Sequence, residues 1–250
     1  MRMRKRPNLE PRMAKCADYL VEEPETLRGM WRESLGGCSA LCLELGCGKG
    51  RFTADMAAAC PDSAIVALEK VRDAMVIAME RARDRALTNV RFVDGDAARL
   101  GEMFADGEID RIYINFCDPW PKSRDAKFRL TAPSFLRTYC DVLPAGGQIH
   151  FKTDNRPLFD WSVEQLKAEG WELSEVTNDL HSGGQTEIIL TDYEVKFIQN
   201  MVKINRLVAT RTADTKGRAA GSLPRLRNAA LTDARGFGQD AEAGDGESER

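Results

Sequence analysis

The sequence has few of the residues that build metal and disulfide sites. Of its 250 residues only two are histidines, His150 and His181, and its seven cysteines include no Cys-x-x-Cys pair. Zinc sites take their ligands from such residues at short spacings, so we expect no metal. The odd, scattered cysteines also favour reduced thiols over a disulfide framework.

Long hydrophobic runs are absent as well. No apolar run approaches the roughly 18 residues needed to cross a bilayer. The basic start at residues 2–6 is not followed by the apolar stretch of a secretory signal. We therefore expect a cytoplasmic protein with no membrane partner.

An excess of positive charge is also missing. The chain carries 36 Lys and Arg against 39 Asp and Glu, a net charge of −3, which by itself does not indicate a nucleic-acid-binding protein. Phosphate binding needs only a local basic face, however. Positive charge gathers at residues 2–6 and at residues 122–129. Either run could be a solvated surface, so its meaning depends on what lies beside it.

From residue 40 to residue 210, short β-type runs alternate with helical patterns. This alternation predicts an α/β fold, a doubly wound and mostly parallel sheet with helices on both faces and an antiparallel last strand. The expected strands are 40–45, 64–68, 90–93, 109–116, 148–152, 171–176 and 202–208. The expected helices are 51–59, 72–86, 133–142, 157–168 and 192–199.

The two ends of the chain differ from this domain. Residues 1–39 are interpreted as a basic arm and a leading helix. From residue 211 to residue 250, Ala, Gly, Arg, Asp and Glu dominate and aromatic residues nearly vanish. Such a segment cannot bury enough apolar surface to offset its ordering entropy, so we expect a disordered, dispensable tail. The expected oligomeric state is a monomer, with a dimer as the alternative.

The first predicted strand runs into a glycine turn, Glu-Leu-Gly-Cys-Gly-Lys-Gly at residues 44–50. Gly46 and Gly48 let the backbone turn tightly and let a ligand approach without a Cβ in the way. The spacing lacks the Gly-x-Gly-x-x-Gly of a dinucleotide site and the Gly-Lys-Ser/Thr of a phosphate loop. Glu44 would repel a pyrophosphate, whereas it suits a ligand that carries an ammonium and a sulfonium.

Acidic residues stand at the ends of the first three predicted strands. Glu44 leads the glycine turn, Glu69 ends the second strand, and Asp96 follows the third. Acids at such positions can bind ribose hydroxyls and the adenine end of a nucleoside. One of them alone is commonly a helix cap, but three in succession indicate a single ligand. Residues 40–210 thus resemble the class I S-adenosylmethionine-dependent methyltransferases, which have a Rossmann-like sheet.

A rigid loop, Asp-Pro-Trp-Pro at residues 118–121, follows the fourth predicted strand. Its prolines stiffen the backbone, and Trp120 offers a face on which a base could stack. This strand lies beside the first in a doubly wound sheet, so Asp118 should face the ligand crevice. A buried Trp in a rigid turn is the simpler interpretation, but it does not explain the basic residues that follow. These are Lys122, Arg124, Lys127 and Arg129.

This run is similar to the Asp-Pro-Trp-Pro-Lys-x-Arg motif of the bacterial tRNA (guanine-N7)-methyltransferases. The basic start ending in Pro7, Phe-Lys-Thr-Asp at 151–154 and Thr-Asp-Tyr-Glu at 191–194 also resemble motifs of that family. The resemblance implies that S-adenosylmethionine is the cofactor and tRNA the partner, with methyl transfer to N7 of guanosine 46 in the variable loop. The site residues it implies are the catalytic Asp118; the cofactor-binding Glu44, Gly46, Gly48, Glu69, Asp96 and Asp118; the substrate-binding Lys122, Asp154, Thr191, Asp192, Tyr193 and Glu194; and the RNA-tracking Arg124, Lys127 and Arg129.

Two positions depart from that family pattern. Asp125 stands where the family usually has His, and Phe128 stands where it usually has a second basic residue. Both changes remove positive charge from the RNA-tracking loop, and Asp125 adds repulsion. They bear on RNA affinity and partner choice more than on chemistry.

The reaction that the resemblance implies needs no general base. Guanine N7 presents a lone pair and carries no proton, so a direct displacement depends on alignment and on exclusion of water. Asp118 would stabilise the cationic product ring. Lys122 would hold O6, and Asp154 would accept from N1–H and the exocyclic amine.

Three alternatives stay open. An exocyclic-amine methyltransferase would carry Asp/Asn-Pro-Pro-aromatic, whereas here Trp120 displaces the second proline. An NAD-dependent oxidoreductase would need the longer glycine spacing. A non-catalytic RNA-binding module would have no need of the four strand-end acids.

Overall fold

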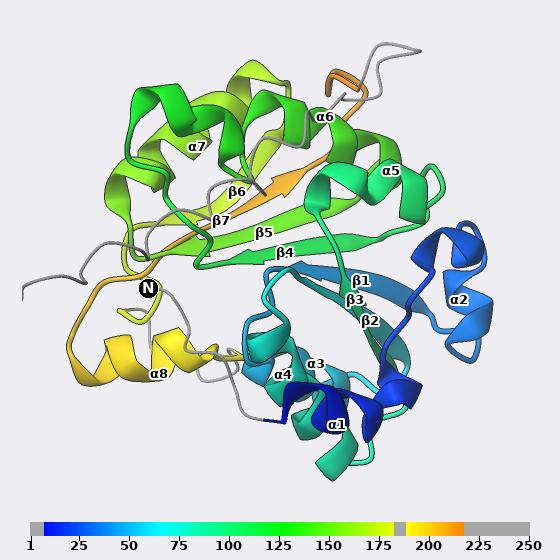
Figure 1. Cartoon of the computed structure of the whole chain (residues 1–250). Helices are drawn as coiled ribbons and strands as arrows, with labels where there is room; N and C mark the ends of the chain where they lie inside the picture. Colours follow the sequence, from blue (N-terminus) through cyan, green and yellow to red (C-terminus); the bar gives the residue numbers. More distant parts are fainter. Residues whose placement is uncertain (1–7, 183–188, 218–250) are drawn as a thin grey trace, which may run out of the picture. The chain divides into compact units, whose positions relative to one another are not determined.

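Seven strands form one sheet in the order β3–β2–β1–β4–β5–β7–β6 (Figure 1). The computed structural model describes residues 8–182 and 189–217, so the basic start at residues 2–6 and residues 218–250 lie outside the described chain. The strands are β1 Ala40–Leu45, β2 Ser63–Glu69, β3 Val90–Asp94, β4 Arg111–Asn115, β5 Gln148–Thr153, β6 Glu172–Thr177 and β7 Asn205–Thr210. The first five strands in this order pair in parallel, while β7 is antiparallel to both β5 and β6. The predicted doubly wound sheet is confirmed.

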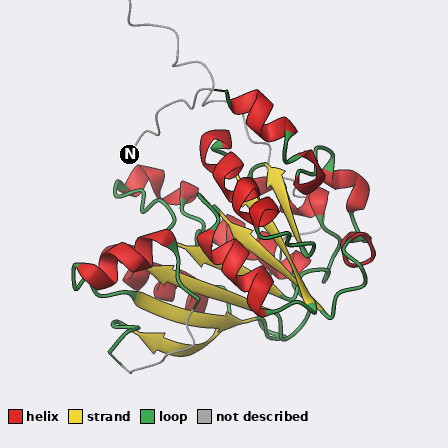
Figure 2. Cartoon of the chain, turned by 90° about the horizontal axis from the view of Figure 1, so that it is seen from below, coloured by secondary structure: helices red, strands yellow, loops and turns green. Residues whose placement is uncertain are grey.

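Helices cover both faces of the sheet, and Figure 2 shows the same layers with strands in yellow. Two of these helices, α3 and α4, lie on one face, and three others, α5 to α7, lie on the opposite one (Figure 1). Their bounds are α3 Arg51–Ala59, α4 Arg72–Asp84, α5 Leu100–Met103, α6 Pro133–Val142 and α7 Arg156–Ala168. Because both faces are buried, the central strands are nearly continuous apolar runs. In β1, Leu41 and Leu43 belong to the core under α6 and α7, whereas Cys42 belongs to the core under α3 and α4.

The strand order reverses between β1 and β4, since the chain leaves β1 toward β2 and returns to β4 on the other side. In open α/β sheets, ligands bind outside the carboxyl ends of the strands at such a reversal. The glycine turn follows β1 and the Asp-Pro-Trp-Pro loop follows β4, so the fold brings these two motifs to one edge.

The described part of the N-terminal segment is built into the body of the protein. Its helices are α1 Leu9–Ala14 and α2 Trp31–Ser34. The Trp31 side chain is completely buried, and its Nε1 donates to the Met103 carbonyl at 2.9 Å. The buried Glu108 carboxylate accepts backbone N–H bonds from Gly29, Trp31 and Ala105. The leading segment therefore contributes to the core of the methyltransferase-like sheet.

The predicted elements and the observed ones differ mainly at their ends. The helix predicted over 72–86 stops at Asp84, because Ala86 takes a left-handed conformation. The last strand was predicted over 202–208 but begins at Asn205, after a turn with Met201 at φ 53°. Residues 211–217, which belong to the predicted tail, hydrogen-bond to the body: Arg211 pairs with Gly146 and Gly147, and Lys216 N–H donates to the Glu169 carbonyl.

Candidate active site

In the glycine turn after β1, two glycines have free space where a Cβ would stand, and a third has none. Gly46 and Gly48 have positive φ angles of 76° and 57°, and a Cβ on either would meet nothing within 4 Å. Gly46 N–H donates to the Leu68 carbonyl at 2.8 Å, which anchors the turn on β2. A Cβ on Gly50 would lie 2.4 Å from the Ala78 Cβ, so Gly50 lets α3 pack closely on α4. Free space thus exists where a ligand is expected.

Glu44 stands in β1 two residues before Gly46, and only 2% of its surface is exposed. One carboxylate oxygen accepts from the Thr53 hydroxyl at 2.5 Å, and the other accepts from Asn115 Nδ2 at 3.1 Å. Burial raises the pKa of Glu44 to about 7, against the opposing effect of these two hydrogen bonds. A bound cation would favour the ionised form of this carboxyl.

Asn115 adds an acceptor that has no protein partner. Its side chain is 8% exposed, and its Oδ1 makes no hydrogen bond to any described residue. An unpaired buried acceptor costs free energy unless a ligand or water satisfies it. Together with Glu44, it fits a ligand that presents several N–H donors and a positive charge, as the α-ammonium of S-adenosylmethionine does.

Glu69 and Asp96 lie at the ends of the next two strands, as predicted. The Glu69 carboxylate accepts from Gly48 N–H and from Val71 N–H, each at 2.8 Å, so it holds the glycine turn. Asp96 accepts from Ala98 N–H at 2.9 Å and pairs with Lys70 Nζ at 2.7 Å. Each carboxylate oxygen can accept a second hydrogen bond. Both residues can therefore stabilise this edge and still bind a nucleoside.

Asp118 is exposed at the carboxyl end of β4, and it makes no hydrogen bond or ion pair to residues in the described ranges. The loop around it contains two non-glycine residues in the left-handed region, Phe116 at φ 55° and Trp120 at φ 42°. Such conformations are uncommon for bulky residues and persist only where neighbours hold them. A free carboxylate on a firmly shaped loop is suited to act on a substrate.

Arg129, predicted to track RNA, also hydrogen-bonds the Asp-Pro-Trp-Pro loop. Its Nε donates to the Pro119 carbonyl at 3.1 Å, and its Nη2 donates to the Trp120 carbonyl at 2.9 Å. The guanidinium also lies 4.4 Å from the centre of the Trp161 ring. These contacts use Nε and Nη2, so Arg129 helps to shape the loop while its Nη1 donors remain available to a ligand.

The remaining basic residues of the predicted RNA-tracking loop lie on the 3-10 helix Ser123–Phe128 and are exposed. Arg124 is within 3.8 Å of the Asp125 carboxylate, and Lys127 Nζ is 5.1 Å from the centre of the Phe128 ring. Phe128 also packs on Trp120, with 5.3 Å between ring centres. The two unusual residues thus have local partners: Asp125 lies beside the exposed Arg124, and Phe128 packs on Trp120.

The predicted substrate segment 191–194 begins helix α8, Asp192–Gln199. Thr191 and Glu194 form a capping box, in which the hydroxyl accepts from Glu194 N–H at 3.0 Å and the carboxylate from Thr191 N–H at 2.8 Å. Glu194 is completely buried and also accepts from Lys152 Nζ at 3.1 Å. Burial lowers the pKa of Lys152, an effect that the charge of Glu194 opposes. These residues hold the helix.

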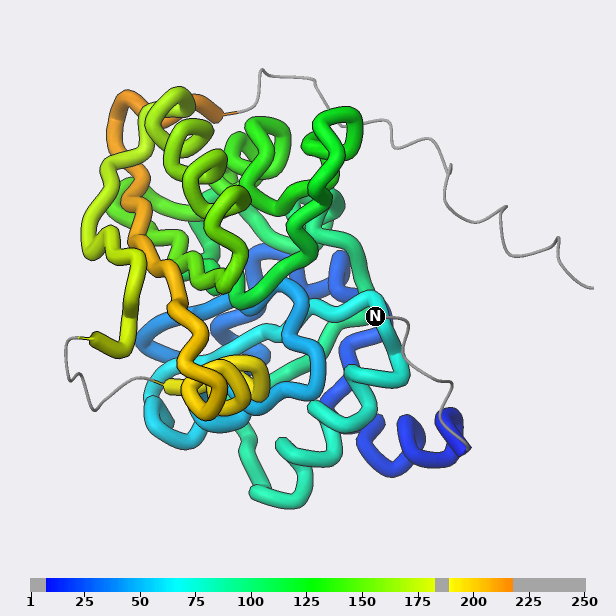
Figure 3. Tube along the Cα trace, turned by 90° about the vertical axis from the view of Figure 1, so that its left-hand side faces the viewer, coloured from blue at the N-terminus to red at the C-terminus, as the bar shows by residue number. Residues whose placement is uncertain are grey.

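Asp192 and Tyr193 take different roles in the same turn. Asp192 pairs with Arg51 at 3.0 Å and with Arg81 at 2.8 Å. Although burial raises the pKa of Asp192, the hydrogen bonds from these two arginines lower it below its ordinary value. Tyr193 is 59% exposed, and its ring stacks on Phe116 with 5.9 Å between centres. The Arg51 contact thus ties α8, drawn in yellow in Figure 3, to the start of α3.

The other two predicted substrate residues, Lys122 and Asp154, are exposed, and Asp154 directly follows β5. Neither side chain makes a hydrogen bond or ion pair among residues 8–182 and 189–217, so both are free to meet a ligand. The structure also adds residues that were not predicted, namely Arg51, Thr53, Arg81, Asn115 and Lys152. Lys152 could have been singled out, because a lysine near the end of a buried strand needs a partner.

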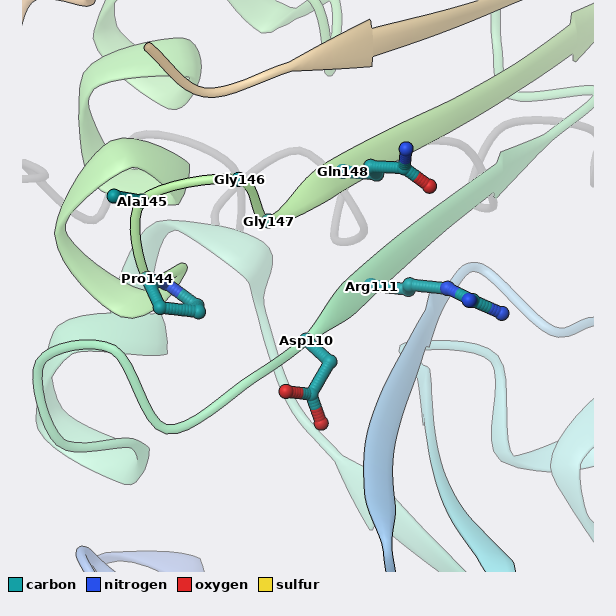
Figure 4. Close-up of a pocket in the computed structure, with 7 residues that line it drawn as sticks. All are labelled: Asp110, Arg111, Pro144, Ala145, Gly146, Gly147 and Gln148. Atoms are coloured by element: carbon teal, nitrogen blue, oxygen red, sulfur yellow. The ribbon is translucent and has the colours of Figure 1, made fainter. Parts of the chain in front are cut away.

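A separate hollow of about 330 Å³ lies at the opposite edge of the sheet, where β4 and β5 begin (Figure 4). It is lined by Asp110, Arg111 and residues 144–148. The Asp110 carboxylate is already occupied by Arg32 and by Leu41 N–H, each at 2.6 Å. This hollow lies where the strands begin, whereas the glycine turn follows the end of β1, so the hollow is not part of the candidate site.

Metal and membrane features are absent from the described chain. No group of three or more His, Cys, Asp or Glu is placed to hold a metal ion among residues 8–182 and 189–217. The helices of those same residues include none that is long and apolar enough to span a bilayer.

Comparison with known proteins defines the class first. The family described as "Putative methyltransferase" matches residues 39–207. The solved structure of the 16S rRNA methyltransferase KamB has a TM-score of 0.54 at 18% identity, covering 72% of this chain and 91% of that one. A 16S rRNA (adenine(1408)-N(1))-methyltransferase from Catenulisporales acidiphilia gives 0.53 at 16% identity, with 76% and 94% covered. The fold is that of a methyltransferase.

Closer relatives define the family. The tRNA (guanine-N(7)-)-methyltransferase of Geobacillus kaustophilus is 40% identical over 211 residues, covering 84% of this chain and 97% of that protein. The enzyme of the same name from Lactococcus lactis subsp. cremoris is 43% identical over 211 residues, with 84% and 97% covered. The chain belongs to the tRNA (guanine-N7)-methyltransferase family.

Proposed function

We propose that this protein transfers the methyl group of S-adenosylmethionine to N7 of a guanine in tRNA, at position 46 of the variable loop. The observation that carries the proposal is Asp118, a carboxylate with no partner in the described part of the chain, on a firmly held loop beside the glycine turn. Its place at the strand reversal puts it where the cofactor side and the substrate side of the site meet.

The cofactor side is formed by β1, β2 and β4. Gly46 and Gly48 leave room for the ligand, while Glu44 and Asn115 would accept from its ammonium. Glu69 would bind the ribose hydroxyls and Asp96 the adenine end, as acids at these strand ends do in Rossmann-like folds. When bound, S-adenosylmethionine supplies an electrophilic methyl group on a sulfonium.

The substrate side has to orient guanine without removing a proton from it. N7 carries its lone pair in the ring plane, so the protein contributes alignment and exclusion of water. Tyr193 and Phe116 form an aromatic surface on which the base can stack. Lys122 can donate to O6, and Asp154 can accept from N1–H and the exocyclic amine. Asp118 lowers the free energy of the cationic product ring.

Contacts to the rest of the tRNA come from exposed cations. Arg124 and Lys127, which are exposed, would meet phosphates, and Arg129 would also support the loop. The methyltransferase domain is proposed to span residues 40–210, and the reaction to take place in the cytoplasm with tRNA as the macromolecular partner.

The proposal is tested by mass spectrometry of nucleosides from tRNA that has been incubated with the protein and S-adenosylmethionine. We expect 7-methylguanosine from a transcript with guanosine 46 and none from the same transcript with adenosine 46. A methyl group on any other atom would overturn the proposal. Methylation of the adenosine 46 transcript at guanine N7 would leave the chemistry in place and refute the position.

A further inference from the structure

Helix α8 is attached to the body in an unusual way. It is eight residues long, and its one buried side chain is that of Glu194, a charged residue. A helix this short is not stable by itself in water and normally needs an apolar stripe packed on a core. Most apolar side chains of α8 are half-buried or exposed, as with Ile198 at 44% exposure. Apart from the packing of Tyr193 and Phe197 on Phe116, the contacts that attach α8 to the body are charged.

The first charged contact is fully desolvated. Lys152 Nζ donates to Glu194 Oε1 at 3.1 Å and to the Ile189 carbonyl at 3.2 Å. The Lys152 side chain is 9% exposed, and its Nζ also lies 5.8 Å from the centre of the Phe52 ring. Removing one partner of such a pair leaves an uncompensated buried charge, which is strongly unfavourable. Lys152 thus ties the start of α8 to β5.

The second charged contact joins α8 to the cofactor side. Asp192 accepts from Arg51, the first residue of α3, and from Arg81 on α4. Arg51 directly follows Gly50, whose close approach to Ala78 fixes α3 on α4. The helix that follows the glycine turn and the helix that carries Tyr193 are therefore joined by one carboxylate.

We propose that Lys152, Arg51 and Arg81 are positioning residues that dock α8, so that Tyr193 is held over Phe116 at the substrate side of the site. Tyr193 stands between the two anchoring acids in sequence, so both contacts limit the movement of its ring. In this view Asp192 and Glu194 act through docking rather than by touching guanine. The docking itself is independent of the proposed function, whereas its effect on methyl transfer rests on that function.

The docking is tested by hydrogen exchange, measured by mass spectrometry on the full chain without tRNA. Lys152→Met should raise the exchange rate of the α8 amides at least tenfold, while the β1 and β4 amides keep their wild-type protection. Lys196→Met is the matched control, because Lys196 is an exposed lysine of the same helix. Wild-type protection of α8 in Lys152→Met, or a rise shared equally by the whole sheet, would overturn the proposal.

Two further variants keep the test decisive if Lys152→Met fails to fold. In the double variant Lys152→Gln with Glu194→Gln, two amides replace the charges and the capping box keeps an acceptor, so α8 protection should return toward wild type. Asp192→Asn weakens the more exposed contact and should raise α8 exchange severalfold, with a larger effect at low salt. An unchanged Asp192→Asn variant would refute the second anchor.

Steady-state kinetics separates docking from a general loss of structure. The soluble docking variants should have a KM for tRNA raised about tenfold or a reduced kcat, with an S-adenosylmethionine Kd within about twofold of wild type. Loosened α8 with methylation at an atom other than guanine N7 would refute the proposed function and leave the docking in place. If the docking variants keep wild-type α8 exchange while the protein forms 7-methylguanosine, the docking is refuted and the proposed function stands.

Discussion

Replacing Glu44 with Gln should stabilise the protein at alkaline pH and weaken its binding of S-adenosylmethionine. Burial raises the pKa of Glu44 from an ordinary 4.5 to about 7, because lost hydration outweighs the hydrogen bonds from Thr53 and Asn115. In the unfolded chain Glu44 has its ordinary pKa. Between about pH 4.5 and 7 its carboxyl is therefore protonated in the folded protein and ionised in the unfolded chain. The contribution of this carboxyl to the free energy of unfolding therefore falls as pH rises through that window.

The size of the effect follows from the two pKa values. Their difference corresponds to about 3 kcal/mol of stability, which is fully present below about pH 4.5 and fully lost above about pH 7. The amide of glutamine imitates the protonated carboxyl, with one acceptor for Asn115 and one donor that the Thr53 hydroxyl can accept. We expect the stability gain of Glu44→Gln over the wild type to be about 1 kcal/mol or less at pH 5 and about 3 kcal/mol at pH 8.

Urea unfolding at pH 5 and pH 8, without cofactor, measures this difference. Comparing variant with wild type at each pH cancels other buried groups, such as His150, whose pKa burial lowers to about 4. Glu164→Gln, an exposed change on α7, is the control and should have no effect at either pH. Equal destabilisation of Glu44→Gln at both pH values would refute the burial argument. Calorimetry should show weaker S-adenosylmethionine binding, since the ammonium loses its counter-charge.

Three other changes test the substrate side and the end of the chain. Asp118→Asn should keep the unfolding free energy and the cofactor affinity of the wild type but reduce kcat at least a hundredfold; near wild-type turnover would remove Asp118 from the catalytic role. Asp125→His frees Arg124 and should tighten tRNA binding by about 1 kcal/mol or less, an effect that shrinks in high salt; weaker binding in filter assays would contradict the placing of this loop against phosphates. Truncation after Gly217 should leave Tm and activity unchanged, whereas truncation after Thr210 should lower Tm, because Arg211 and Lys216 hydrogen-bond to the body; equal Tm values for both would show that these contacts contribute nothing.

Much of the fold could be predicted because the periodicity of apolar residues is local information. The predicted bounds of β1, α3, α6 and α8 coincide with those observed. The acids after the first three strands could be placed at one edge by topology alone, since parallel strands end on the same side. Element ends were less accurate, because left-handed turns at Ala86 and Met201 are set by residues without a strong turn signal.

The partners of the charged residues could not be predicted, because they lie far apart in the sequence. Asp192 and Arg51 are separated by 141 residues, and Glu194 and Lys152 by 42. A family motif assigns a residue to a function but does not distinguish contact with the substrate from support of a neighbour. Arg129 illustrates this: its charge suggests phosphate, whereas its geometry satisfies two backbone carbonyls.

The left-handed conformations at Phe116 and Trp120 also bear on the kinetics of association. Because Arg129 and Phe128 hold this loop, its unfavourable backbone geometry is imposed during folding, before any tRNA arrives. Such preorganisation reduces the conformational entropy lost on binding. Encounter should then be limited by electrostatic steering rather than by loop rearrangement, and variants that loosen the loop should act mainly by slowing productive association. Stopped-flow binding of labelled tRNA would show this as a saturating association rate in Arg129→Gln and a linear one in the wild type.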